Sequence, residues 1–183
     1  DNIPEDEIER LPSLFINENN ISDVVQVSEG VYTPLTGFMD LNQINSVLTK
    51  NELLNGATWS MPIVLQVNSN EVEKIKNEDK LVLLNQKDHS PVGLLEIQAI
   101  EKLKPFNEIL IKWFGTNDRK HPGVQQIVNG GKYIVSGIPY LFRNYQQKIK
   151  KEYEYSPKQT REIFYHNGWY NIVGFHTRNI PHT

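Results

Sequence analysis

The pattern of apolar and polar residues divides most of the chain into short strands and short helices. Runs rich in Val, Leu and Ile predict strands at 63–67, 80–84, 92–100 and 133–135. The polar stretch 85–91 separates two of these runs and predicts a hairpin-type loop. Such short apolar runs, separated by turn residues, are typical of a β-rich domain.

Helical signals lie between the strands. Asp40 is a good N-cap residue, and the apolar residues that follow it fall on one helical face as far as Leu48. Two more short helices are predicted at 106–114, where Gly115 ends the pattern, and at 122–128, where a proline begins it. Short strands with irregular helices between them indicate an α+β, mainly β, barrel-like domain with helical additions.

The first 20 residues carry a different pattern. Asp1–Arg10 contains five acidic residues and one arginine, and asparagines gather at the end of this segment. We expect residues 1–20 to form a weakly ordered lead-in with a short helix around Glu5–Leu11. This acidic start is unlike a secretory signal peptide, which has a basic end followed by an apolar stretch.

The pattern sharpens again after a basic, polar stretch at 146–154. Ser156, Pro157 and Gln159 form a capping-box sequence, which predicts a helix that continues to Asn167. The apolar run Trp169–Phe175 then predicts a buried strand of a parallel sheet. A helix, a strand and a loop are the opening of an α/β domain. We therefore divide the chain into a first domain, 1–153, and the start of a second, 154–183.

Composition narrows the classes of function. The chain has 183 residues, 38% of them hydrophobic, with a formal net charge of −3 and no cysteine. It therefore lacks disulfides and cysteine nucleophiles, which fits a cytoplasmic protein. No apolar run approaches the roughly 20 residues that span a bilayer, and no basic stripe is visible, so we expect neither membrane nor nucleic acid as a partner.

Candidate chemistry gathers after the predicted strand at 169–175. The segment 176–183 contains His176, Arg178, Asn179 and His182. Ligands of open α/β sheets bind beyond the carboxyl ends of strands, and the guanidinium of arginine matches phosphate or sulfate. The segment therefore suits an anionic ligand, although a solvated polar loop remains an alternative on composition alone.

Asp118 and His121 are a second candidate, since their spacing would suit an acid–base pair on a helix. Pro122 and Gly123 follow directly, however, and favour a loop or a helix start. We therefore expect Asp118 to serve as a turn or cap residue.

Five segments of the chain, taken in order, resemble the ATP sulfurylases, or sulfate adenylyltransferases. Read as sequence they are VYTPLTGFM at 31–39, LNGATWSMPI at 54–63, GTNDRKHPGV at 115–124, SPKQTR at 156–161 and GWYNIVGFHTRN at 168–179. The resemblance extends from about Val25 to His182. It implies a PUA-like β-barrel N-terminal domain, followed by the first helix and strand of an α/β nucleotidyltransferase domain.

The resemblance also implies roles for individual residues. Arg178 matches the family's sulfate-binding arginine, and Asn179 and His182 match residues that contact the ATP phosphates. His176 stands where many members have a sulfate-contacting glutamine, and Thr177 lies between these groups. Arg178 and His182 would thus be catalytic, and all five would bind substrate.

The implied reaction joins ATP and sulfate to give adenosine 5′-phosphosulfate and pyrophosphate, with Mg²⁺ carried on the ATP phosphates rather than on a metal site of this chain. The second histidine of the family's HxxH signature would lie beyond Thr183, so we expect this chain by itself to be an inactive N-terminal fragment. A homo-oligomer and a fused adenylylsulfate kinase domain are further expectations for the parent enzyme. The alternative is a PUA-like module that binds RNA or another protein.

Overall fold

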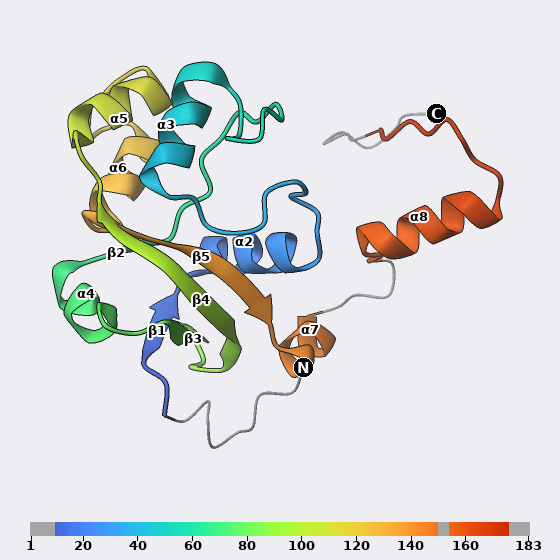
Figure 1. The fold of residues 1–183 in the computed structure, drawn as a ribbon, viewed down its shortest axis with the longest axis horizontal. Helices are drawn as coiled ribbons and strands as arrows, with labels where there is room; N and C mark the ends of the chain where they lie inside the picture. Colours follow the sequence, from blue (N-terminus) through green and yellow to red (C-terminus); the bar gives the residue numbers. More distant parts are fainter. Residues whose placement is uncertain (1–9, 150–153, 176–183) are drawn as a thin grey trace. The chain divides into compact units, whose positions relative to one another are not determined.

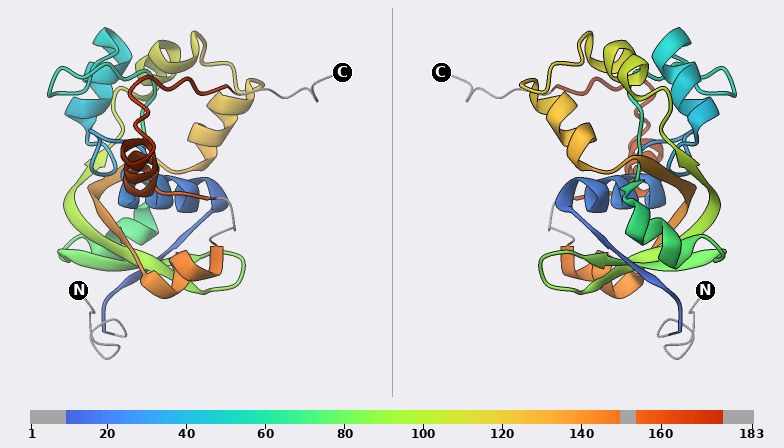
Figure 2. Two further views of the ribbon diagram at one scale, coloured as in Figure 1. Left: turned by 90° about the vertical axis from the view of Figure 1, so that its right-hand side faces the viewer. Right: turned by 90° about the vertical axis from the view of Figure 1, so that its left-hand side faces the viewer.

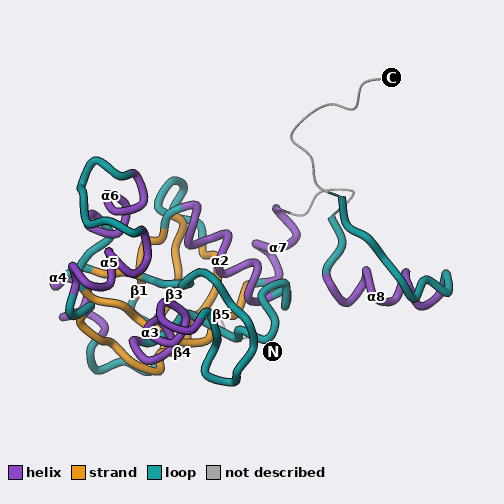
Figure 3. The backbone as a smooth tube through the Cα atoms, turned by 90° about the horizontal axis from the view of Figure 1, so that it is seen from above, coloured by secondary structure: helices purple, strands orange, loops and turns teal. Residues whose placement is uncertain are grey.

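The computed structural model describes residues 10–149 and 154–175, and divides the chain into two compact units, Asp1–Lys150 and Lys151–Thr183 (Figure 1). The first unit contains every strand of the described residues. Figure 3 shows these strands together in the first unit, whereas the described part of the second unit contains one helix and loops.

A five-stranded mixed sheet forms the centre of the first unit. In chain order the strands are β1 (Ser13–Ile16), β2 (Gln66–Val67), β3 (Lys80–Asn85), β4 (Pro91–Lys102) and β5 (Tyr133–Leu141). Their order across the sheet is β1-β3-β4-β5-β2, and only the β1–β3 pair is parallel. The sheet curls into a half-barrel (Figure 2), which confirms the predicted α+β, PUA-like class of fold.

Three of the predicted strands are confirmed, and each is longer than its apolar run. The hairpin of β3 and β4 is present as predicted, and β5 continues to Leu141. The predicted strand at 63–67 is reduced to Gln66–Val67. The Ile63 carbonyl instead accepts a hydrogen bond from the backbone of Met39 at 3.0 Å, so this part of the chain pairs with a loop.

The prediction of a weakly ordered lead-in over residues 1–20 is wrong for its second half. Ser13–Ile16 pairs in parallel with β3 and buries Leu14 and Ile16. Asn17 then caps helix α2 (Glu18–Ser28) by accepting a hydrogen bond from the backbone of Asn20 at 3.0 Å. Pairing with a strand nearly seventy residues later stabilises β1, and the local acidic composition does not indicate it. Most of the helix expected at Glu5–Leu11 lies outside the described residues.

Six helices accompany the sheet in the described part of the first unit. The predicted helices are confirmed as α3 (Leu41–Lys50), α5 (Phe106–Phe114) and α6 (Pro122–Asn129), and the Asp40 carboxylate caps α3 by accepting from the backbone of Gln43 at 2.7 Å. Two helices that were not predicted, α4 (Ser69–Ile75) and α7 (Arg143–Ile149), complete the unit together with α2.

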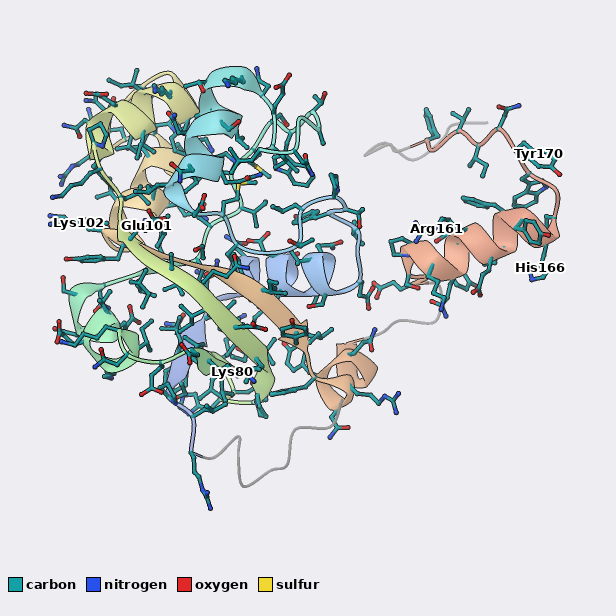
Figure 4. All side chains as sticks on the ribbon, viewed as in Figure 1. Lys80, Glu101, Lys102, Arg161, His166 and Tyr170 are labelled. Carbon is teal, nitrogen blue, oxygen red and sulfur yellow. The ribbon has the colours of Figure 1, made fainter. Side chains whose placement is uncertain are left out.

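The core of the first unit is a single apolar cluster. Helix α2 lies on the concave side of the curled sheet and packs against β5 (Figure 2), and its Val24 is fully buried in the core. Helices α3, α5 and α6 group together at one end of the sheet (Figure 1). Glu101, near the end of β4 (Figure 4), accepts a hydrogen bond from the backbone of Leu41 at 3.0 Å and so ties the sheet to the start of α3.

Candidate functional site

The five residues predicted to bind ATP and sulfate, His176, Thr177, Arg178, Asn179 and His182, lie outside the described residues. Their roles therefore stay predictions. The described residues 154–175 lead into this segment. They show how the chain approaches the candidate site.

Helix α8 (Pro157–His166) precedes the candidate segment and begins as its sequence predicts. The Ser156 hydroxyl accepts a hydrogen bond from the backbone of Gln159 at 3.3 Å, and the Gln159 side chain accepts one from the backbone of Ser156 at 2.9 Å. The Thr160 hydroxyl adds a bond to the Ser156 carbonyl at 2.7 Å. These bonds satisfy backbone donors of the first turn and fix the start of the helix.

The end of α8 is equally well defined. Gly168 adopts a left-handed conformation with φ of +66°, and the Trp169 backbone donates to the Phe164 carbonyl at 2.9 Å. The Trp169 ring then lies 6.2 Å from the Phe164 ring. This turn folds the chain back beside the helix that it has just left.

The predicted buried strand at Trp169–Phe175 is wrong for the structure of this chain. These residues form no strand, and Tyr170, Val173 and Phe175 are 92%, 92% and 86% exposed. A parallel strand requires a neighbouring strand that supplies its hydrogen bonds. The described residues of the second unit contain no strand with which this run could pair.

The described part of the second unit is therefore an amphipathic helix and an apolar tail without a core of their own. None of the residues of α8 is buried, and several large apolar side chains of residues 154–175 are exposed. Arg161 and His166 lie on α8, and Tyr170 lies in the tail (Figure 4).

Asp118 and His121 have structural roles in the first unit. The Asp118 carboxylate accepts a hydrogen bond from the backbone of Lys120 at 2.9 Å, which is a turn interaction. His121 is the N-cap of α6, where Nδ1 accepts from the backbone of Val124 at 3.4 Å. These bonds agree with the expected turn or cap role and give the two side chains no joint chemistry.

An unusual titratable pair lies near α2. Burial raises the pKa of Asp23 to about 6, and the hydrogen bond donated by the Tyr32 hydroxyl, 3.5 Å away, opposes this shift. The Tyr32 ring packs edge-on against the Trp59 ring at 5.7 Å. The pair is a half-buried polar contact between α2 and the loop that precedes α3.

A surface groove of about 240 Å³ is a site that the sequence pattern did not indicate. Residues 34–40, mostly from the family-like segment 31–39, form one wall, and Leu53, Leu54 and Asn55, around the start of the segment 54–63, form a second wall. Gln43 of α3, Gln98 of β4 and Ile138 of β5 complete the lining. Neither segment alone reveals the groove, because it exists only where the two meet. Among the described residues, no group of three or more His, Cys, Asp or Glu side chains could hold a metal ion.

The curled mixed sheet and its helices define the class of protein. The chain belongs to the PUA-like domain family, whose model matches residues 2–142. A second family model, described as ATP-sulfurylase, matches residues 151–183. The resemblance to ATP sulfurylases drawn from the sequence motifs is thereby confirmed.

Curated relatives agree with both matches. The chain is 34% identical over 174 residues to the sulfate adenylyltransferase of Trichormus variabilis. This match covers 95% of this chain and 44% of the relative. It is also 34% identical over 171 residues to the sulfate adenylyltransferase of Pyrococcus abyssi. That match covers 93% of this chain and 43% of the relative. The chain thus spans less than half the length of these relatives.

A solved structure shows the same fold. The hexameric APS kinase from Thiobacillus denitrificans superposes with a TM-score of 0.60 at 18% identity, over 90% of this chain and 28% of that one. Within the described residues, no helix is long and apolar enough to cross a membrane.

Proposed function

We propose that the chain is the N-terminal part of a sulfate adenylyltransferase, with a PUA-like domain over 1–153 and the start of the catalytic domain over 154–183. The observation that supports this most strongly is the similarity to sulfate adenylyltransferases along 95% of the chain, together with the ATP-sulfurylase match that begins at residue 151. Function resides in specific sites rather than in folds, so the proposal depends on the segment 176–183.

In this proposal a sulfate oxygen attacks the α-phosphorus of ATP and pyrophosphate leaves, without a protein nucleophile. Arg178 binds sulfate through its planar guanidinium, and Asn179 and His182 donate hydrogen bonds to the ATP phosphates. His176 and Thr177 complete the sulfate side of the site. Mg²⁺ enters with ATP and offsets the negative charge of the phosphates.

The proposal includes the setting of the site. Helix α8 and the apolar tail at 169–175 pack, in the parent enzyme, against the rest of the catalytic domain. Such packing pairs the tail as a strand and places Arg178 at its carboxyl end, where α/β sheets bind ligands. The 183-residue chain alone is then inactive. The parent is a cytoplasmic enzyme, because ATP is its substrate, and assembles as a homo-oligomer. A fused adenylylsulfate kinase domain is a further part of the proposal.

A chimera tests the proposal. This chain replaces the equivalent part of the Trichormus variabilis enzyme, and sulfate-dependent release of pyrophosphate from ATP is measured. We expect the chimera to be active and the Arg178→Ala variant to lose about 100-fold or more of that activity. Lys158→Ala, which removes an exposed charge of α8, is the matched control and should retain activity.

Two outcomes contradict the proposal. One is a chimera that is folded by circular dichroism but releases no pyrophosphate. The other is an Arg178→Ala chimera as active as the control. Release of pyrophosphate by the 183-residue chain alone would refute the predicted inactivity of this chain.

A further inference from the structure

The groove between the family-like segments is a well-supported recess on the first unit. Residues Phe38 and Gly137 exchange backbone hydrogen bonds of 2.9 and 3.3 Å, which hold one wall against β5. On the other wall, Leu53 donates to the Ala57 carbonyl at 2.8 Å, within a compact turn. The Gln43 side chain links the walls by accepting from the backbone of Leu54 at 3.3 Å. Walls fixed in this way can bind a ligand without first being ordered.

Gln98 enters the groove because of an irregularity in the sheet. The register of β4 against β5 passes from Ile97 to Ala99 and skips Gln98, so Gln98 is the bulged residue. Bulges re-aim side chains and are frequent beside functional sites. The exposed Gln98 side chain makes no hydrogen bond within the described residues, and it lines the groove.

The lining has one charge and several free polar groups. Asp40 is the only charged residue among those that line the groove, and its carboxylate uses one oxygen to cap α3. Thr36 and Gln98 offer further oxygen acceptors, while Leu35, Leu54 and Ile138 supply apolar surface. Leu54 is 62% exposed at the rim. A site with one carboxylate and no cation disfavours sulfate, phosphate and nucleotides.

We propose that this groove binds an arginine or lysine side chain presented by a polypeptide partner. These side chains combine an apolar stem with a cationic head, which matches the apolar walls and the carboxylate of Asp40. The carboxamides of Gln43 and Asn55 keep amide hydrogens that no bond uses among the described residues, and these can donate to the partner's peptide carbonyls. The proposal does not depend on the proposed enzymatic function, because it concerns a different part of the chain.

A titration followed by ¹H–¹⁵N NMR tests the proposal on the whole 183-residue chain. The probe is N-acetyl-arginine methylamide, and its neutral isostere N-acetyl-citrulline methylamide is the matched control ligand. We expect the arginine probe to shift amides at 35–40, 53–55 and 98, with affinity at least about tenfold higher than that of the citrulline probe. Ethylguanidinium, which has no peptide groups, should bind more weakly than the arginine probe.

Two substitutions in the groove test whether the cationic group of the probe binds there. Asp40→Asn removes the charge but keeps a good helix cap, so α3 stays intact while affinity falls about tenfold. Gln98→Lys adds a like charge at the bulge and should also weaken binding, whereas Asp118→Asn, outside the lining, should not. Unchanged affinity in both groove variants, equal binding of the citrulline probe or of ethylguanidinium, or an absence of shifts at these amides would each overturn the proposal.

Discussion

Substitution of Gly37 by alanine should destabilise the first unit through a clash with backbone atoms. A Cβ at position 37 would lie 2.1 Å from the carbonyl oxygen of Gly137, whereas ordinary contacts begin at 3.4 Å. The backbone of β5 cannot rotate away as the end of a flexible side chain can. Relief therefore requires the segment that contains Phe38 to move away from β5.

The cost follows from what that movement breaks. Overpacking against a fixed neighbour costs about 1–3 kcal/mol. The two backbone hydrogen bonds between Phe38 and Gly137 each contribute about 0.5–1.5 kcal/mol when they are lost. We therefore expect Gly37→Ala to lower the free energy of unfolding by about 2–6 kcal/mol, which is a large share of the total stability of a domain.

Urea unfolding followed by tryptophan fluorescence measures this change. A Trp169→Phe background restricts the signal to Trp59 and Trp113, which pack against the core of the first unit. Thr36→Ala, an exposed change in the same segment, is the matched control and should alter stability by less than about 0.5 kcal/mol. If Gly37→Ala differs from this control by less than about 1 kcal/mol, the steric argument is refuted.

Three further predictions concern single side chains. Burial raises the pKa of Asp23 from its ordinary value of 3.8 to about 6 in the folded chain, so the folded state holds this proton more tightly and stability falls as pH rises from about 4 through 6. Asp23→Asn should therefore raise the free energy of unfolding, measured in urea, by about 1 kcal/mol at pH 7 once partial solvent screening is allowed for, and should leave it unchanged below pH 4. A lower free energy of unfolding at pH 7 would contradict this. Ser156→Ala removes the cap of α8 and should increase amide hydrogen exchange of that helix about fivefold, whereas unchanged exchange would refute a stabilising cap. Gln66→Ala removes the hydrogen bonds of 2.9 and 2.7 Å that the carbonyls of Ile127 and Gly131 accept from Gln66, and should lower the free energy of unfolding by about 1–3 kcal/mol. A decrease below about 0.5 kcal/mol would show that water replaces these hydrogen bonds.

Features encoded by neighbouring residues were predictable from the sequence. The cap at Asp40 and the capping box at Ser156 lie within three residues of their partners, so the helices they begin are where the sequence predicts them. The β3–β4 hairpin is another local feature, because its two apolar runs are separated only by a short polar loop. The motifs that resemble ATP sulfurylases are likewise readable in order along the chain, and the family matches confirm the resemblance.

Features that depend on distant partners were decided only by the tertiary structure. Ser13–Ile16 becomes a strand because β3 pairs with it, and the apolar run 169–175 is no strand because no described strand of its unit pairs with it. The groove arises where residues 34–40 meet Asn55 and the bulged Gln98, three places that local patterns treat as unrelated. Local propensity and capping act over a few residues, whereas strand pairing and the shape of a surface depend on contacts between segments far apart in the chain, and these contacts form only in the folded protein.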